Sequence, residues 1–171
     1  MLFKKHGASD FTWIDPKDIV TAQWVRMKCT FGCGNYGKHA CCPPYVPSVP
    51  ECRQFFDEYE TGVIFHFTIA FENREDRRAW AVNTNRSLLD LERDIFLDGN
   101  RKTFLLPANS CNLCDQCGGT KDACRNQAVA RPTPEGMAID VYSTVRRYGL
   151  PIQVLKDRTR TENRYAFLLI E

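Results

Sequence analysis

The chain has 171 residues, of which 43% are hydrophobic and 26% are charged, as is typical of a globular domain with a substantial core. The net charge of +2 is too small to indicate a nucleic-acid partner. No apolar run reaches the roughly 18 residues that a membrane-spanning helix needs. Residues 1–6 show no apolar stretch that would indicate a signal peptide. We therefore expect a cytoplasmic protein folded as one domain over residues 1–171.

The first 50 residues predict two short elements followed by a loop. Asp15 and Pro16 fit a helix cap and a first helical position, so a short helix is expected through residue 20. Residues 24–28 alternate apolar and polar side chains, which predicts a short extended segment. Residues 29–50 are rich in cysteine, glycine and proline and should form an irregular loop.

The middle of the chain predicts a helix, a strand, a long helix and a second strand. Ser48 and Glu51 fit a capping box, which should start a helix that reaches about residue 59. Residues 63–71 are apolar on both faces, which favours a central strand. Helical spacing of apolar residues predicts a helix over 73–98, followed by a strand over 103–106. This order implies two parallel strands joined by a crossover.

The last third predicts a helix and two closing strands. A helix should run from Thr133 to Gly149, and residues 152–155 and 165–170 should form an antiparallel pair. The expected fold is therefore α+β, with a mixed sheet, flanking helices and two cysteine-rich metal-binding loops at 29–52 and 111–124.

Nine cysteines are the main chemical signal of this sequence. Cytosolic thiols stay reduced, and an odd number cannot pair completely, so a disulfide framework is not expected. Buried structural cysteines would be scattered on apolar faces, whereas these are clustered among glycine, proline and polar residues. The pattern therefore favours metal binding.

The second cluster contains Cys111, Cys114 and Cys117 at successive two-residue gaps, and Cys124 follows after six more residues. Three cysteines at this spacing are typical of bacterial ferredoxins, in which such a loop holds a [4Fe–4S] cluster. Cys124 either completes this cluster or binds another one. Zinc is the alternative, although zinc sites usually combine two separated CxxC pairs, or CxxC with histidine.

The first cluster contains Cys29, Cys33, the adjacent pair Cys41 and Cys42, and Cys52. Adjacent side chains diverge, so Cys41 and Cys42 should not bind the same ion. We favour Cys42 as a ligand, because Pro43 fixes the turn after it, and we regard Cys41 as spare. Cys52 should lie in the first turn of a helix, where the helix dipole favours a thiolate, although it is also consistent with a buried helical cysteine.

The predicted metal ligands are eight thiols, enough for two [4Fe–4S] clusters: Cys29, Cys33, Cys42, Cys52, Cys111, Cys114, Cys117 and Cys124.

The order and spacing of both clusters resemble a known family. The shared features are Cys29-x3-Cys33, Cys42-Pro43-Pro44 and Cys52-Arg53, followed by Cys111-x2-Cys114-x2-Cys117 and Cys124-Arg125. Over residues 25–170 the chain resembles a prokaryotic family of predicted metal-binding proteins, domain of unknown function 2284. The resemblance implies metal binding, and an anaerobic setting that suits oxygen-sensitive clusters. Family members often have proline after the third cysteine of the second loop, where this chain has Gly118-Gly119.

These observations lead to a hypothesis of electron transfer. Two clusters on one domain would pass single electrons to a partner redox protein, and the protein would set their potentials through burial and hydrogen bonds to sulfur. The alternatives are a zinc-stabilised interaction module and an enzyme in which one cluster has only three protein ligands and an open iron. Failure of Cys52 or Cys124 to ligate would favour the enzyme.

Two further groups of polar residues have other interpretations. Arginines crowd the C-terminal third and could dock an acidic redox partner, although a solvated surface is the simpler interpretation. His39 and His66 are more consistent with a loop residue and a hydrogen-bonded core residue than with ligands. The arginines in question are Arg125, Arg131, Arg146, Arg147, Arg158, Arg160 and Arg164.

Overall fold

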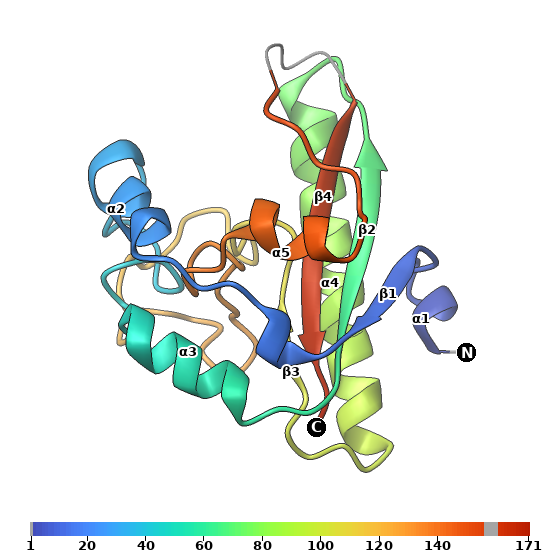
Figure 1. Ribbon diagram of the computed structural model, residues 1–171. Helices are drawn as coiled ribbons and strands as arrows, with labels where there is room; N and C mark the ends of the chain where they lie inside the picture. Colours follow the sequence, from blue (N-terminus) through green and yellow to red (C-terminus); the bar gives the residue numbers. More distant parts are fainter. Residues whose placement is uncertain (1, 156–160) are drawn as a thin grey trace.

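The sheet of this protein has four strands, and each pair of neighbours is antiparallel. The computed structural model describes residues 2–155 and 161–171. The strands lie in the order β1-β2-β4-β3 (Figure 1). Their bounds are β1 (Phe11–Ile14), β2 (Gly62–Ile69), β3 (Phe104–Leu106) and β4 (Glu162–Leu169).

Helices cover both faces of this sheet. In Figure 1, α4 lies along one face, and α3, α5 and the long loops lie on the other. The helices are α1 (Leu2–Lys5), η1 (Pro16–Asp18, a 3-10 helix), α2 (Gln23–Gly32), α3 (Val49–Asp57), α4 (Arg74–Leu97) and α5 (Val141–Arg147). Among the residues described, no helix is both long and apolar enough to cross a membrane.

The α+β class is confirmed, but the sheet is antiparallel throughout rather than mixed. The two strands joined by α4, β2 and β3, are each antiparallel to β4 and therefore run in the same direction, as expected from the crossover. They do not pair with each other, because β4 lies between them. The central position expected for residues 63–71 is confirmed, since β2 has β1 on one side and β4 on the other.

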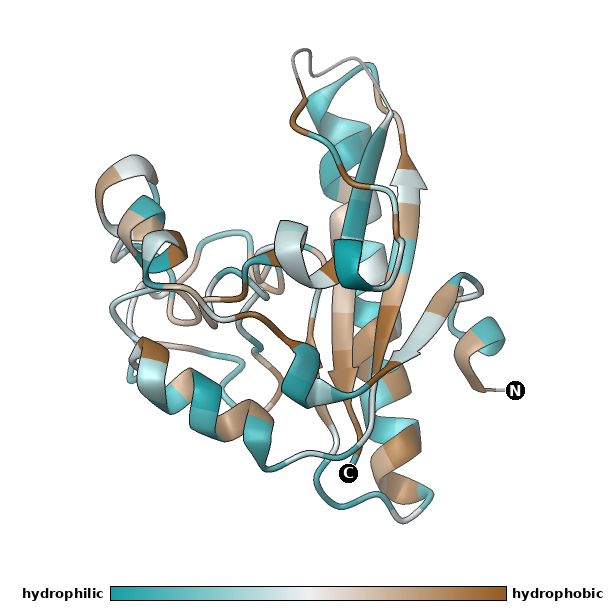
Figure 2. Cartoon of the chain, in the orientation of Figure 1, coloured by the Kyte–Doolittle hydropathy of each residue, from teal (hydrophilic) through white to brown (hydrophobic). Residues whose placement is uncertain are grey.

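Alternating side chains of the central strands build a core on each face. Val63, Phe65 and Leu168 pack with Leu88 and Leu91 of α4 on one face. On the other face Ile64, Phe167 and Leu169 pack with Phe56 of α3 and Val145 of α5. Figure 2 shows the hydrophobic residues along β2 and the C-terminal part of β4, whereas the start of β4 is hydrophilic.

Local capping explains where two predicted helices begin. The capping box before α3 is confirmed, because Glu51 Oε2 accepts hydrogen bonds from the Ser48 backbone N–H at 2.7 Å and from the Ser48 hydroxyl at 2.6 Å. Asp15 caps η1 by accepting from the Lys17 backbone N–H at 2.9 Å. These caps place the polar side chains of the sequence where unpaired helical N–H groups need them.

The extended segment expected at 24–28 is wrong, because these residues lie within α2. Arg26, Met27 and Lys28 are good helix formers, and Val25 is the only side chain of this helix that is fully buried. Arg26 fixes the helix from its side by donating to the backbone carbonyls of Pro47 at 3.0 Å and Gly136 at 3.1 Å. The helix also includes Cys29, which was expected in the loop.

The helix expected from 133 to 149 is much shorter. Ala138 has a φ of 61°, and the Asp140 backbone N–H donates to the Val20 carbonyl at 2.8 Å, so this stretch pairs with another segment and does not stay helical. The helix α5 begins only at Val141, after Asp140 accepts from the Ser143 backbone N–H at 3.0 Å. Residues 152–155 form no strand, whereas the strand expected at 165–170 is confirmed as β4.

Candidate metal centre

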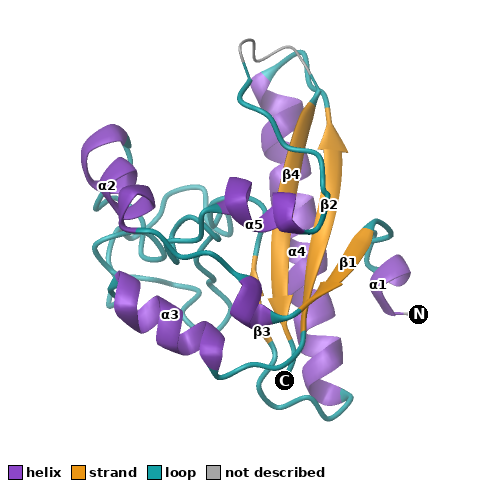
Figure 3. Cartoon of the chain, in the orientation of Figure 1, coloured by secondary structure: helices purple, strands orange, loops and turns teal. Residues whose placement is uncertain are grey.

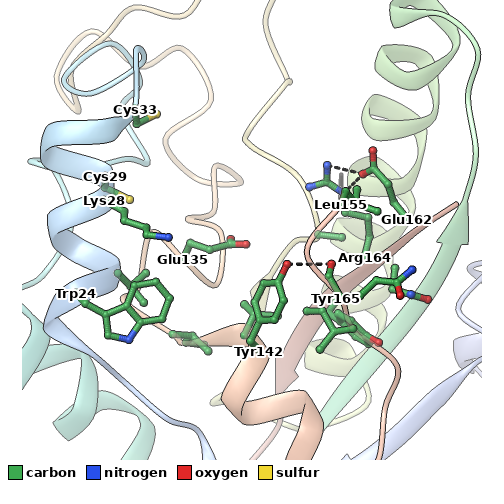
Figure 4. A pocket seen from close by; sticks show the side chains of 17 residues that line it. Trp24, Lys28, Cys29, Cys33, Glu135, Tyr142, Leu155, Glu162, Arg164 and Tyr165 are labelled. Carbon is green, nitrogen blue, oxygen red and sulfur yellow. Dashed lines mark hydrogen bonds and ion pairs between the residues drawn. The ribbon is translucent and has the colours of Figure 1, made fainter. Parts of the chain in front are cut away.

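Cys29 lies within α2, and Cys33 directly follows the last residue of this helix in an extended conformation. Figure 4 shows both side chains on the α2 side of a cleft, with Glu135 between α2 and the sheet and with Glu162 and Arg164 opposite. This cleft has a cavity of about 510 Å³ lined by both cysteines. Glu135, which was expected on a helix, extends from a turn into this cleft.

A compact loop brings Cys42 to the same two thiols. The Gly37 backbone N–H donates to the Pro43 carbonyl at 3.0 Å, with Gly37 at a φ of 71°, and the Cys42 N–H donates to the His39 carbonyl at 3.0 Å. A second cavity of about 880 Å³ is lined by Cys29, Cys33 and Cys42 together. Burial raises the pKa of Cys42 to about 11, and the nearby thiolates of Cys29 and Cys33 add to this shift.

The fourth predicted ligand of the first cluster, Cys52, lies elsewhere. It is fully buried in α3, packs in the hydrophobic core, and donates a weak hydrogen bond from its thiol to the Pro47 carbonyl at 3.6 Å. Burial raises its pKa, and the charge of Arg26 opposes that effect. Cys52 lines neither of the cavities that contain Cys29 and Cys33.

All four cysteines of the second cluster surround a smaller cavity of about 240 Å³. Cys41 lines this cavity too and forms a hydrogen bond with Cys111, which lowers the pKa of Cys111 and raises that of Cys41. The thiol of Cys41 is therefore the donor and the Cys111 thiolate is the acceptor. The cavity is lined by Cys41, Cys111, Cys114, Cys117 and Cys124.

Two further contacts shape this second loop. Asn126 Nδ2 donates to Cys114 Sγ at 2.9 Å, and Arg125 donates to the Gln116 carbonyl at 2.7 Å. Gly118 is required because a Cβ at this position would lie 2.1 Å from the Ala123 carbonyl oxygen. The loop can therefore fold back on itself directly after Cys117 only with glycine at this position.

The two cysteine groups are adjacent in space. In Figure 1 the segment after β3 lies beside the loop between α2 and α3, and Figure 3 shows both as irregular chain. His39 and Asn112 line both the 880 Å³ and the 240 Å³ cavities. The neighbouring residues Cys41 and Cys42 each line a different one of these two cavities.

Comparison with known proteins identifies the family of this chain. The model of a family described as "Predicted metal-binding protein (DUF2284)" matches residues 12–170. The chain belongs to the DUF2284 family. No curated protein and no solved structure matches the chain.

The region that matches the DUF2284 family includes both cysteine groups, so these cysteines belong to the part of the chain shared with predicted metal-binding proteins. In the part of the chain that the structure describes, no three His, Cys, Asp or Glu side chains converge closely enough to hold one metal ion. The nine cysteines are all free thiols, and eight of them line one of the two cavities.

Three arginines of the C-terminal third are paired with carboxylates in this DUF2284 chain. Arg131 forms a half-buried ion pair with Glu92 at 2.9 Å, and Arg164 binds Glu162 at 2.8 Å. Arg147 contacts Asp18 at 3.7 Å. Arg158 and Arg160 lie outside the described residues. Docking of a redox partner on this region stays a prediction.

The structure also shows functional candidates that the sequence analysis missed. Arg74, Arg77 and Arg78 of α4 line the 880 Å³ cavity opposite the cysteines. Their spacing of three and four residues on a helix was the available signal, because such residues share one face. His66 is a hydrogen-bonded core residue, as expected, since its ring nitrogens contact Asp10 and Asn163 at 2.7 Å each.

Proposed function

We propose that this protein is an iron–sulfur enzyme with two [4Fe–4S] clusters held in different ways. Four cysteines of the second loop hold one cluster: Cys111, Cys114, Cys117 and Cys124. Three cysteines hold the other: Cys29, Cys33 and Cys42. The observation that carries this proposal is the sorting of the thiols, with three at the large cavity, five around the small cavity and Cys52 in the core.

The small cavity fits a cluster better than a single zinc ion. A structural zinc ion needs four ligands that converge on one point, with Zn–S distances of about 2.3 Å. Here the thiols surround a cavity of about 240 Å³, and a cluster would fill that volume while each thiolate binds a different iron. Cys41 and Asn126 donate to two of the proposed ligand sulfurs, as expected around a cluster whose potential is set by such contacts.

The three-cysteine group leaves room for a substrate. An iron without a protein ligand acts as a Lewis acid or exchanges electrons with a bound substrate. Cys29 and Cys33 line cavities of about 510 and 880 Å³, which are within the usual size of small-molecule sites. Glu135 lines both cavities; burial and the neighbouring Cys33 raise the pKa of Cys29, and the negative charge of Glu135 adds to this shift. Its carboxylate is therefore placed to exchange a proton with a molecule bound there.

The two groups together also support the transfer of electrons. Cys41 contacts Cys111 of the second group, and the next residue, Cys42, belongs to the first group. One peptide unit thus connects the surroundings of both proposed clusters. In our proposal Cys111, Cys114, Cys117 and Cys124 would hold a cluster able to accept single electrons from a partner redox protein, and Cys29, Cys33 and Cys42 would hold a second one beside the cleft.

The open iron can be tested with cyanide, a small ligand for an exposed iron. In the anaerobically reduced protein, we expect cyanide to change the electron paramagnetic resonance signal of one cluster and to leave the other signal unchanged. The Cys42→Ala variant should lack the cyanide-sensitive signal, because it loses one of three ligands. Cys52→Ala, the control, should respond like the wild type. If cyanide changed neither signal, the open-site function would be wrong.

Hydrogen bonds to the proposed ligand sulfurs should set the potential of the second cluster. Cys41→Ala and Asn126→Ala each remove one donor, which destabilises the more negative reduced state. We expect each variant to lower the potential by roughly 20–60 mV, the one-electron equivalent of a hydrogen bond of about 0.5–1.5 kcal/mol. A redox titration with Cys52→Ala as control measures this. Unchanged potentials in both variants would contradict the proposed contacts.

A further inference from the structure

The cavity that contains the three-cysteine group is also lined by several basic side chains. Arg74, Arg77 and Arg78 of α4 and Arg164 of β4 line the same 880 Å³ cavity as the three thiols. Among the described residues that line it, Glu135 is the one carboxylate. The side chains that line this cavity therefore carry an excess of positive charge.

Two of these arginines are held in place by a buried carboxylate. Glu162, whose side chain is 5% exposed, forms ion pairs with both Arg77 and Arg164. This arrangement fixes two guanidinium groups at the wall and satisfies part of their charge. The contact between Arg78 and Asp115 is 3.5 Å long, and both side chains are exposed, so this pair is weak.

Arg74 has no such partner. Within residues 2–155 and 161–171, its side chain makes no hydrogen bond or ion pair. It is the first residue of α4, where the positive end of the helix dipole disfavours a cation. A cationic side chain at this position is therefore not explained by the stability of the helix, and it is available to a bound anion.

A residue that lines the same cavity carries a buried donor without an acceptor. Asn109 lines the cavity, and its Nδ2 atom is buried without a hydrogen-bond partner in the described structure. A buried donor that stays unpaired is unfavourable, so a ligand that accepts a hydrogen bond from it would be stabilised. This observation is independent of the arginines and indicates the same type of ligand, one with acceptor oxygens.

We propose that this cavity binds a small organic anion through a carboxylate or phosphate group. Arg74 and Arg78 bind the anionic group, since the guanidinium fork matches the oxygens of both groups, and Asn109 donates to it. The rest of the molecule extends toward Cys29, Cys33 and Cys42. This inference rests on the proposed function, because it names the substrate class of that enzyme.

The test is calorimetric titration of the metal-loaded protein with inorganic phosphate and with malonate. The Arg74→Gln/Arg78→Gln variant should bind the preferred anion at least about tenfold more weakly, because it loses two charge-assisted contacts. The matched control is Arg86→Gln/Arg93→Gln, which removes two exposed charges from the same helix outside the cavity. This control should bind like the wild type. The preference between the two probes identifies the anionic group.

Three outcomes would overturn the inference: no binding of either probe, equal binding by both double variants and the wild type, or equal weakening in both double variants. Thermal unfolding should show the same midpoint for both double variants, which excludes misfolding as the cause.

Iron content measured on the same samples separates the two proposals. Full iron without anion binding overturns this inference alone, whereas selective anion binding by a protein that cannot take up iron supports it and removes the proposed cluster chemistry.

Discussion

Replacement of Cys114 by alanine is expected to remove one cluster and leave the other. Cys114 belongs to the group around the small cavity, and its sulfur accepts a hydrogen bond from Asn126 at 2.9 Å. After anaerobic reconstitution, the variant should contain about four irons per chain, compared with about eight in the wild type. The remaining signal should keep its response to cyanide, because Cys29, Cys33 and Cys42 are unchanged.

Two other cysteines provide matched controls for this experiment. Cys52→Ala should keep all of its iron, because Cys52 lies in the core next to Pro47 and away from both cavities. Cys41→Ala should also keep its iron, because Cys41 is proposed to donate to Cys111 without binding iron. If Cys41→Ala lost as much iron as Cys114→Ala, Cys41 would be a ligand, and the fourth position assigned to Cys124 would be wrong.

Among the variants proposed here, Glu92→Ala is expected to cause the largest fall in the free energy of unfolding. Glu92 is 6% exposed and lies in α4. Its Oε1 atom accepts from Arg131 Nε at 2.9 Å and from the Leu105 backbone N–H at 2.8 Å. Glu92→Ala leaves both donors without this acceptor, so the free energy of unfolding should fall by about 3–5 kcal/mol. Urea denaturation monitored by circular dichroism measures the change.

Another carboxylate of the same helix serves as the control. Asp94 contacts Lys5 at 3.0 Å and His6 at 2.9 Å, but it lies near the surface. Asp94→Ala should therefore reduce the free energy of unfolding much less than Glu92→Ala does, because solvent screens an ion pair at the surface. Equal losses for Glu92→Ala and Asp94→Ala would show that the buried contact with Arg131 and Leu105 does not hold α4 to β3.

The parts of the fold that can be predicted from the sequence have strong local signals. The capping box at Ser48 and Glu51 fixes the start of α3 through contacts within one turn. The strand β2 is apolar on both faces, and α4 has apolar residues at helical spacing. Each pattern shows which side chains of a segment are buried, whatever they pack against. The element type can therefore be predicted without knowing the neighbouring segments.

The parts that sequence reasoning missed depend on contacts between distant segments. Residues 24–28 alternate like a strand, yet Arg26 binds the carbonyls of Pro47 and Gly136, and the segment is helical. Residues 133–140 look helical, yet Asp140 pairs with Val20. The insertion of β4 between β2 and β3 is also a long-range effect, since local pattern cannot show which strands pair.

The candidate site shows the same limit. Spacing alone groups Cys52 with Cys29, because both belong to one cysteine-rich stretch, but the structure buries Cys52 in α3 and leaves three thiols at the cleft. The divergence of Cys41 and Cys42 is predictable from their adjacency, whereas the group that each one joins is not. The spacing of Arg74, Arg77 and Arg78 predicts a shared helix face, but only the fold shows that this face meets the cysteines.

The most direct test of the central claim is the content of iron, acid-labile sulfide and zinc in protein purified without oxygen. Two clusters predict about eight irons and eight sulfides per chain, together with a brown colour. A colourless protein with one or two zinc ions, and without iron even after reconstitution, would contradict the account and leave a zinc-stabilised module.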